Sequence, residues 1–186
     1  MDMNPQAMSI EGVESVASGG IEAQLEAFHP ASFGWALACC GFDRQEAEDV
    51  LQTAYLKAIE GRARFNGHSS TRTWFFSVVR LTAIEQRRYR TVRRLALLRW
   101  IQGAPAPDSS PTPEDVSGGE EKQRRLRACL ARLSPRQREL LHLVFYQELT
   151  IEDAAQVLGI SVGSARTHYE RGKAQLRKLL AEDGSR

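Results

Sequence analysis

The stretch Thr150–Leu180, TIEDAAQVLGISVGSARTHYERGKAQLRKLL, decides the fold of the C-terminal part of this 186-residue chain. Its apolar spacing predicts a short helix, a turn at Gly159-Ile160-Ser161 and a longer basic helix. Thr150 and Ser161 can each cap a helix start with a side-chain oxygen, and Gly159 suits the left-handed end of a helix. Two helices joined by such a turn have the layout of a DNA-reading helix-turn-helix.

The two expected helices share an apolar core and leave a polar face for solvent. Ala155 permits their close approach. The expected core residues are Ala154, Val157, Leu158, Ile160, Ala165, Tyr169, Leu176 and Leu180. The polar face contains Ser164, Arg166, Thr167, His168, Arg171 and Lys173. These side chains can reach base edges and phosphates in a major groove, although a plain helical hairpin with a solvated basic face is the alternative.

A break in composition divides the chain. Gly103–Gly119, GAPAPDSSPTPEDVSGG, replaces the apolar periodicity found on either side by proline, serine, glycine and acids. Its apolar residues are too sparse to offset the entropy of ordering, so we expect a mobile linker. The predicted organisation is an N-terminal tail at 1–20, a helical domain at 21–100, a linker at 101–121 and the helix-turn-helix domain at 122–182.

Both domains are expected to be all-α, because the strict alternation typical of strands is absent. The predicted fold class is therefore an all-α protein with two small helical domains joined by a flexible linker. Expected helices cover about 21–39, with an adjustment at Pro30, then 44–62, 71–94 and 120–132. Another begins after Ser134, where a capping serine, a first-turn proline and Gln137 follow one another as in a capping box.

The segment Glu46–Glu60, EAEDVLQTAYLKAIE, predicts an amphipathic helix. The stripe expected to face the core consists of Ala47, Val50, Leu51, Ala54, Tyr55, Ala58 and Ile59. Another side presents Asp49, Gln52, Thr53 and Leu56. An acid, an amide and a large apolar residue on one exposed face can form a protein-docking patch, and a merely solvated face explains the pattern equally well.

The helix expected from Thr71 combines aromatic residues with a basic run. From Arg80 to Arg99 there are seven arginines, at positions 80, 87, 88, 90, 93, 94 and 99, against the single acid Glu85. Aromatic rings can stack on unpaired bases while arginines hold the phosphates, so we expect the arginines to contact DNA. The residues assigned to the core instead are Phe75, Val78 and Val79.

Composition argues against several other classes of protein. No apolar run of about 18 residues exists, and residues 1–20 lack the layout of a secretory signal, so we expect a cytoplasmic protein without membrane insertion. Cys39, Cys40 and Cys129 lack the spacing of zinc or disulfide sites and are expected as small buried residues. We expect no metal site, no cofactor and no catalytic residue, hence no enzyme.

One family shares the order and spacing of several stretches in this chain: Glu46–Leu56, Phe65–Ser70 with Thr73–Phe75, Leu133–Arg138 and Leu149–Leu180. The chain resembles the extracytoplasmic-function (ECF) group of bacterial sigma factors, short proteins with two helical regions and a linker. The likeness extends from about Gln24 to Leu180. It implies a subunit that docks on core RNA polymerase, recognises promoters and helps to open them.

The resemblance also implies roles for individual residues. The clamp helices of the largest polymerase subunit would contact Asp49, Gln52, Thr53 and Leu56. The minus-ten promoter element would contact Asn66, His68, Ser69, Trp74, Arg80, Arg87 and Arg88. The minus-thirty-five element would contact Ser164, Arg166, Thr167, His168, Arg171 and Lys173. Members are often held inactive by an anti-sigma protein, commonly membrane-anchored, so such a partner is expected.

Three departures from the family pattern limit these implications. Thr53 stands where an acid is usual, Leu81 where asparagine is frequent, and His168 where arginine is frequent. The promoter sequence therefore does not follow by analogy.

Two alternative functions remain at this point. A helix-turn-helix regulator that binds duplex DNA without polymerase would explain Thr150–Leu180 but would leave the Asp49 face and the basic helix unused. An enzyme built around His29, Cys39 and Cys40, with or without a metal ion, would lack a recognisable nucleophile and base.

Overall fold

The computed structural model describes residues 20–100 and 120–183, and in these ranges the regular structure is entirely helical, as expected. The N-terminal domain has a helical segment at 20–27, then α2 (His29–Cys39), α3 (Arg44–Ile59) and α4 (Thr71–Trp100). The C-terminal domain has α5 (Glu120–Ala131), α6 (Pro135–Leu141), the π-helix η1 (His142–Tyr146), α7 (Ile151–Leu158) and α8 (Val162–Asp183). The expected tail and most of the expected linker lie outside the described residues.

Local capping explains where the helices of the C-terminal domain begin and end. Ser134 and Gln137 form the expected reciprocal capping box at the start of α6. Thr150 caps α7, and Ser161 caps α8 in the same way. Gly159 ends α7 in the left-handed conformation, with φ of 63°. The helix boundaries expected for the helix-turn-helix are thus confirmed.

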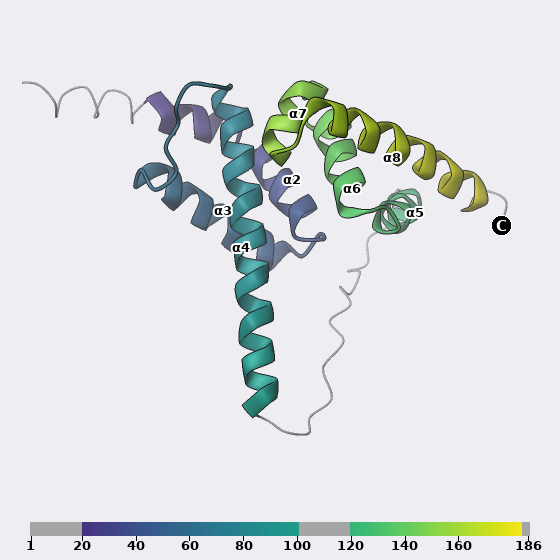
Figure 1. The fold of residues 1–186 in the computed structure, drawn as a ribbon, viewed down its shortest axis with the longest axis horizontal. Coiled ribbons are helices and arrows are strands. Elements are labelled where there is room, and N and C mark those ends of the chain that lie inside the picture. Colours follow the sequence, from purple (N-terminus) through teal and green to yellow (C-terminus); the bar gives the residue numbers. More distant parts are fainter. Residues whose placement is uncertain (1–19, 101–119, 184–186) are drawn as a thin grey trace, which may run out of the picture.

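Helix α4 is the axis of the N-terminal domain, and α2 and α3 pack against it and against each other (Figure 1). Trp35, Phe75 and Phe76 are fully buried there. The indole Nε1–H of Trp35 donates a 2.9 Å hydrogen bond to the backbone carbonyl of Phe76, which joins α2 to α4. Burial of a side chain as large as phenylalanine contributes roughly 1.5–3 kcal/mol, so these residues dominate the core.

Helix α8 crosses the other helices of the C-terminal domain and packs against α5, α6 and α7. Gly172 permits a close approach to α6, because a Cβ there would lie 3.0 Å from Cβ of Gln137. The core between α5, α6 and α8 contains Cys129, Leu133, Leu141 and Leu179.

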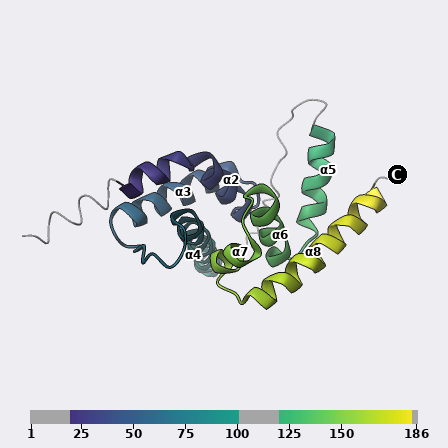
Figure 2. The same cartoon turned by 90° about the horizontal axis from the view of Figure 1, so that it is seen from above.

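The two domains also pack against each other, mainly through α4 and α7 (Figure 2). Leu140 and Leu143 of the C-terminal domain are fully buried in the same apolar cluster as Trp35 and Phe76. Beyond this contact, the C-terminal half of α4 extends away from both domains (Figure 1).

Three helices differ from the expected bounds. Helix α3 ends at Ile59 rather than at residue 62. The helix expected at 21–39 is interrupted at Phe28, because Pro30 lies in the first turn of α2 and has no amide hydrogen to continue the preceding helix. Helix α4 continues to Trp100 rather than ending near Arg94.

The expected core is confirmed for most positions and wrong for two. Ile59 is 55% exposed because it is the last residue of α3, where no neighbouring helix covers it. Leu180 is 42% exposed, and the adjacent Leu179 is buried in its place, since only one of two neighbouring residues on a helix can face α5 and α6. The cysteines are buried as expected: Cys39, Cys40 and Cys129.

His142 lies at the contact between the domains. Its ring is 5.4 Å from the ring of Trp35 and stacks on Tyr146 at 5.3 Å. Its Nε2 lies 3.1 Å from Nε2 of Gln147, an amide nitrogen that can only donate, so the imidazole accepts the hydrogen bond and is neutral. Burial lowers the pKa of His142 from 6.5 to about 4.

We expect the free energy of unfolding to fall as the pH drops from 6.5 towards 4, because the unfolded chain then protonates His142 while the folded chain does not. The contribution is complete above this window, and its loss amounts to about 3 kcal/mol at most. Urea unfolding at several pH values should show a larger loss for the wild type than for His142→Gln. Equal losses for the two proteins would contradict the assignment.

Candidate nucleic-acid and protein interfaces

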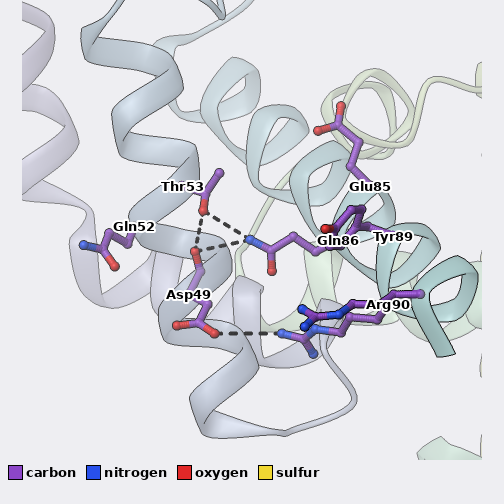
Figure 3. A pocket seen from close by; sticks show the side chains of 8 residues that line it. Asp49, Gln52, Thr53, Glu85, Gln86, Tyr89 and Arg90 are labelled. Atoms are coloured by element: carbon purple, nitrogen blue, oxygen red, sulfur yellow. Dashed lines mark hydrogen bonds and ion pairs between the residues drawn. The ribbon is translucent and has the colours of Figure 1, made fainter. Parts of the chain in front are cut away.

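An open groove between α3 and α4 brings several expected docking residues together (Figure 3). Its wall from α3 contains Asp49, Gln52 and Thr53. Its wall from α4 contains Glu85, Gln86, Tyr89, Arg90 and Arg93. Leu56 lies one turn further along α3 and is 44% exposed, so all four expected docking residues belong to one side of this helix.

Polar contacts across the groove position its side chains (Figure 3). Gln86 Nε2 donates to Thr53 Oγ1 at 3.1 Å, and Thr53 Oγ1 donates to the backbone carbonyl of Asp49 at 2.8 Å. Arg90 lies 3.9 Å from the carboxylate of Asp49 and 3.0 Å from that of Glu46. The Asp49 carboxylate remains half-exposed, so it can still contact a protein that enters the groove.

The loop before α4 presents the first group of expected DNA-binding residues. Asn66 and His68 are exposed, and the Asn66 side chain accepts a 3.2 Å hydrogen bond from the backbone of His68. Ser69 is partly exposed beside them. Trp74 is half-buried against Phe65, with ring centroids 5.4 Å apart, so part of the indole stays accessible.

The three expected DNA-binding arginines of α4 have different surroundings. Arg88 is exposed. Arg87 is exposed overall but donates a hydrogen bond to the backbone carbonyl of Cys39. Arg80 is buried and paired with Glu139 of α6 at 3.2 Å, so it cannot reach DNA in this arrangement. Its position four residues after the fully buried Phe76 is the sequence signal that could have indicated burial.

The expected polar face of α8 is accessible. Exposed side chains on it are Ser164, Arg166, Thr167 and Arg171, while His168 and Lys173 are partly buried. Arg166 pairs with Glu152 of α7 at 2.8 Å, and both are exposed. Such surface pairs contribute little, about 0–1 kcal/mol, so Arg166 can exchange this partner for a phosphate or a base.

Sequence reasoning missed Gln147 and Glu139. Gln147 is almost fully buried, and its amide contacts Arg72, Ala31 and His142. No periodicity or motif singles out a glutamine between an apolar run and an acid, because two of its three partners, Arg72 and Ala31, lie in the other domain.

The residues of the enzyme alternative show no reactive arrangement. His29 lies against the hydroxyl of Tyr55 at 2.9 Å. Burial raises the pKa of Cys39, and burial followed by Glu46 raises that of Cys40 to about 12, so both stay protonated thiols. In the part of the chain that the structure describes, no group of three histidine, cysteine or acidic side chains could hold a metal ion, and no helix is long and apolar enough to span a membrane.

Comparison with known proteins agrees with this geometry. The family model "Sigma-70 region 2" matches residues 25–94, and "Sigma-70, region 4" matches residues 123–176. The RNA polymerase sigma factor YlaC of Bacillus subtilis is 30% identical over 138 residues, which cover 74% of this chain and 79% of YlaC. The ECF sigma factor SigX of the same organism is 31% identical over 147 residues, with coverages of 76% and 75%.

The chain belongs to the ECF sigma factors. These proteins are transcription initiation factors rather than enzymes, so family membership supports the sigma function over a duplex-DNA regulator. The fold is also similar to that of the sigma factor RpoE of Bartonella quintana, solved with the anti-sigma factor NepR. That match has a TM-score of 0.67 and 23% identity, and it covers 87% of this chain and 97% of RpoE. CnrH, solved with the cytosolic domain of CnrY, matches with a TM-score of 0.60 and 23% identity over 91% of this chain and 95% of CnrH.

The buried cysteines of this sigma factor should react very slowly with a thiol reagent at about pH 8 while the protein is folded, because all three are covered and burial also raises the pKa of Cys39 and Cys40. In denaturant the three thiols should react at once. A Lys178→Cys variant supplies an exposed thiol as the control. Rapid reaction of the native thiols would contradict the burial of these residues and revive a redox or catalytic role.

Proposed function

We propose that this ECF sigma factor binds core RNA polymerase, directs it to specific promoters and assists their opening. The observation that supports this most is that the chain matches both sigma region 2 and sigma region 4. Region 2 has an accessible docking groove, and region 4 has an accessible basic helix. The polymerase supplies the chemistry, and the protein acts in the cytoplasm.

The docking surface for the clamp helices of the largest polymerase subunit is the side of α3 with Asp49, Gln52, Thr53 and Leu56. The exposed Leu56 offers apolar area, and the half-exposed Asp49 offers a carboxylate for a basic partner. The contacts from Gln86 and Arg90 hold this face in position before docking, which reduces the entropy lost on binding.

Region 2 contacts the minus-ten element through the loop and the exposed part of α4. The residues proposed for this role are Asn66, His68, Ser69, Trp74, Arg80, Arg87 and Arg88. Stacking on an aromatic side chain contributes about 1–3 kcal/mol per base, which offsets the few kcal/mol needed to unstack a base pair. Arg80 can take part only after region 4 has moved away from it.

Region 4 reads the minus-thirty-five element with α8. The helix-turn-helix places α8 in the major groove, where Arg166 and Arg171 can contact guanine or phosphate and Ser164, Thr167, His168 and Lys173 complete the face. Solved relatives are complexes with anti-sigma factors, so we also propose an anti-sigma partner for this chain, commonly membrane-anchored in the family.

Run-off transcription with core polymerase on a library of promoter fragments tests the function. Specific transcripts should appear with the wild type and should fall at least tenfold with Asp49→Ala plus Gln52→Ala, or with Arg166→Ala plus Arg171→Ala, since each loses on the order of 1–3 kcal/mol of contacts. Glu22→Ala plus Gln24→Ala removes an acid and an amide from another exposed surface and should leave transcription unchanged. Duplex binding without transcripts on any template would favour the regulator instead.

A duplex-binding assay tests the role of α8 separately. Arg166→Ala should weaken binding to a selected promoter duplex by about 1–3 kcal/mol. Glu152→Ala removes the partner of Arg166 and should preserve or strengthen binding, because the guanidinium is then free for DNA. Fluorescence anisotropy measures both, and unchanged affinity of Arg166→Ala would exclude a contact from this residue.

A further inference from the structure

One side of α4 carries exposed apolar side chains over much of its length. Leu81 is 54% exposed, and Val92 and Leu95 are 66% and 57% exposed further along. These residues lie close to whole numbers of turns apart at 3.6 residues per turn, so they share one side of the helix. Arg80 lies about 100° round the helix from Leu81 and contacts Glu139 of region 4, so region 4 packs against a different side. The side with Leu81 is therefore open to a partner.

Leu81 lies between an aromatic and a cationic residue of this side. Trp74 precedes it and Arg88 follows it by two turns each, which corresponds to about 10 Å in either direction. Trp74 is half-buried against Phe65, and Arg88 is exposed. An indole, a branched alkyl group and a guanidinium thus follow one another along the helix, starting next to the loop proposed to contact the minus-ten element.

The charges around Leu81 favour a nucleic-acid strand as the partner. Glu85, one turn further along, is the single acid of the basic run. Its carboxylate is paired with Nζ of Lys57 from α3. This pairing offsets the charge of Glu85, so the nearby guanidinium of Arg88 makes the side positive and attracts a phosphate.

A leucine side chain discriminates among bases differently from a polar one. It neither donates nor accepts a hydrogen bond, so it gains only from contact with an apolar group on a base edge. Among the four bases of DNA, thymine alone presents such a group, its C5 methyl. A cytosine amino group held against Leu81 would lose its hydrogen bond to water without a replacement, which costs free energy. An exposed leucine at this place therefore favours thymine and disfavours cytosine.

We propose that Leu81 is a specificity-determining residue for single-stranded promoter DNA and selects thymine through its methyl group. The strand lies along one side of α4, with a base on the indole of Trp74, a thymine methyl on Leu81 and a phosphate at Arg88. The inference rests on the proposed role of region 2 in binding the minus-ten strand, and it adds Leu81 to the residues proposed for that role.

The first measurement is binding of fluorescent oligo(dT) and oligo(dU), each of about 15 nucleotides, to the full chain without polymerase. The two probes differ only in the methyl groups of their bases. The wild type should bind oligo(dT) about fourfold more tightly, the factor that corresponds to about 0.8 kcal/mol for one buried methyl-sized group. Leu81→Ala and Leu81→Asn should bring the ratio close to one. Leu81→Met should keep most of it, because methionine is apolar and similar in volume.

Two control variants separate the methyl contact from a general change in affinity. Leu180→Asn makes the same substitution at an exposed leucine of the other domain and should keep the wild-type ratio. Arg88→Gln should weaken the binding of both probes by the same factor, because their phosphates are identical, and should also keep the ratio. Circular dichroism verifies that each variant is folded.

The second measurement uses the polymerase holoenzyme, at limiting concentration, on a promoter identified by the run-off assay. Each thymine of the minus-ten region on the non-template strand is replaced in turn by deoxyuridine. At one position the replacement should lower the transcript yield about fourfold with the wild type, for the same buried methyl group. With Leu81→Asn the replacement at that position should have no effect, while the remaining thymines should behave alike in both proteins.

Several results would overturn the role of Leu81. They are equal binding of the two probes by the wild type, binding of neither probe, and a ratio that stays unchanged in both Leu81→Ala and Leu81→Asn. Promoter transcription without any position sensitive to deoxyuridine would overturn it as well. Failure of the sigma function itself appears separately, as absence of run-off transcripts from wild type and variants alike, whatever the ratio of the two probes.

Discussion

The packing of α2 against the first half of α4 is the contact on which the other surfaces depend. The buried indole of Trp35 and its hydrogen bond to Phe76 join these helices. Phe76 and Ala83 are buried on one face of α4. Gln86 and Arg90 follow on the same face, at spacings of three and four residues, and contact α3. One helix therefore supplies both the core of region 2 and a wall of the proposed polymerase-docking groove.

The basic run of α4 is not a uniform patch, because each arginine has its own surroundings. Arg80 is buried against Glu139, Arg87 donates to the carbonyl of Cys39, and Arg90 pairs with Glu46. Arg88 remains exposed. The effective positive charge available to DNA is therefore smaller than the sequence indicates, and it depends on the position of region 4.

The two proposed DNA-binding faces differ in their relation to the domain interface. Most of the polar face of α8 is exposed, and its Arg166 pairs with the exposed Glu152 of α7. The start of α4, in contrast, contacts α7 directly. The same arrangement thus leaves the helix proposed to read the minus-thirty-five element accessible and restricts the surface proposed for the minus-ten element.

Several features could be predicted from local sequence alone: the helical class, the helix starts at Ser134, Thr150 and Ser161, the turn at Gly159 and the family. Capping and apolar periodicity act within about four residues along the chain, so they can be read without knowledge of distant neighbours. Other features depend on contacts between distant parts of the chain: Arg80 is buried, Gln147 joins the domains, His142 is neutral, and Leu179 rather than Leu180 enters the core. Each of these outcomes depends on which residues of a distant segment pack against the position. The periodicity within one helix does not specify those residues.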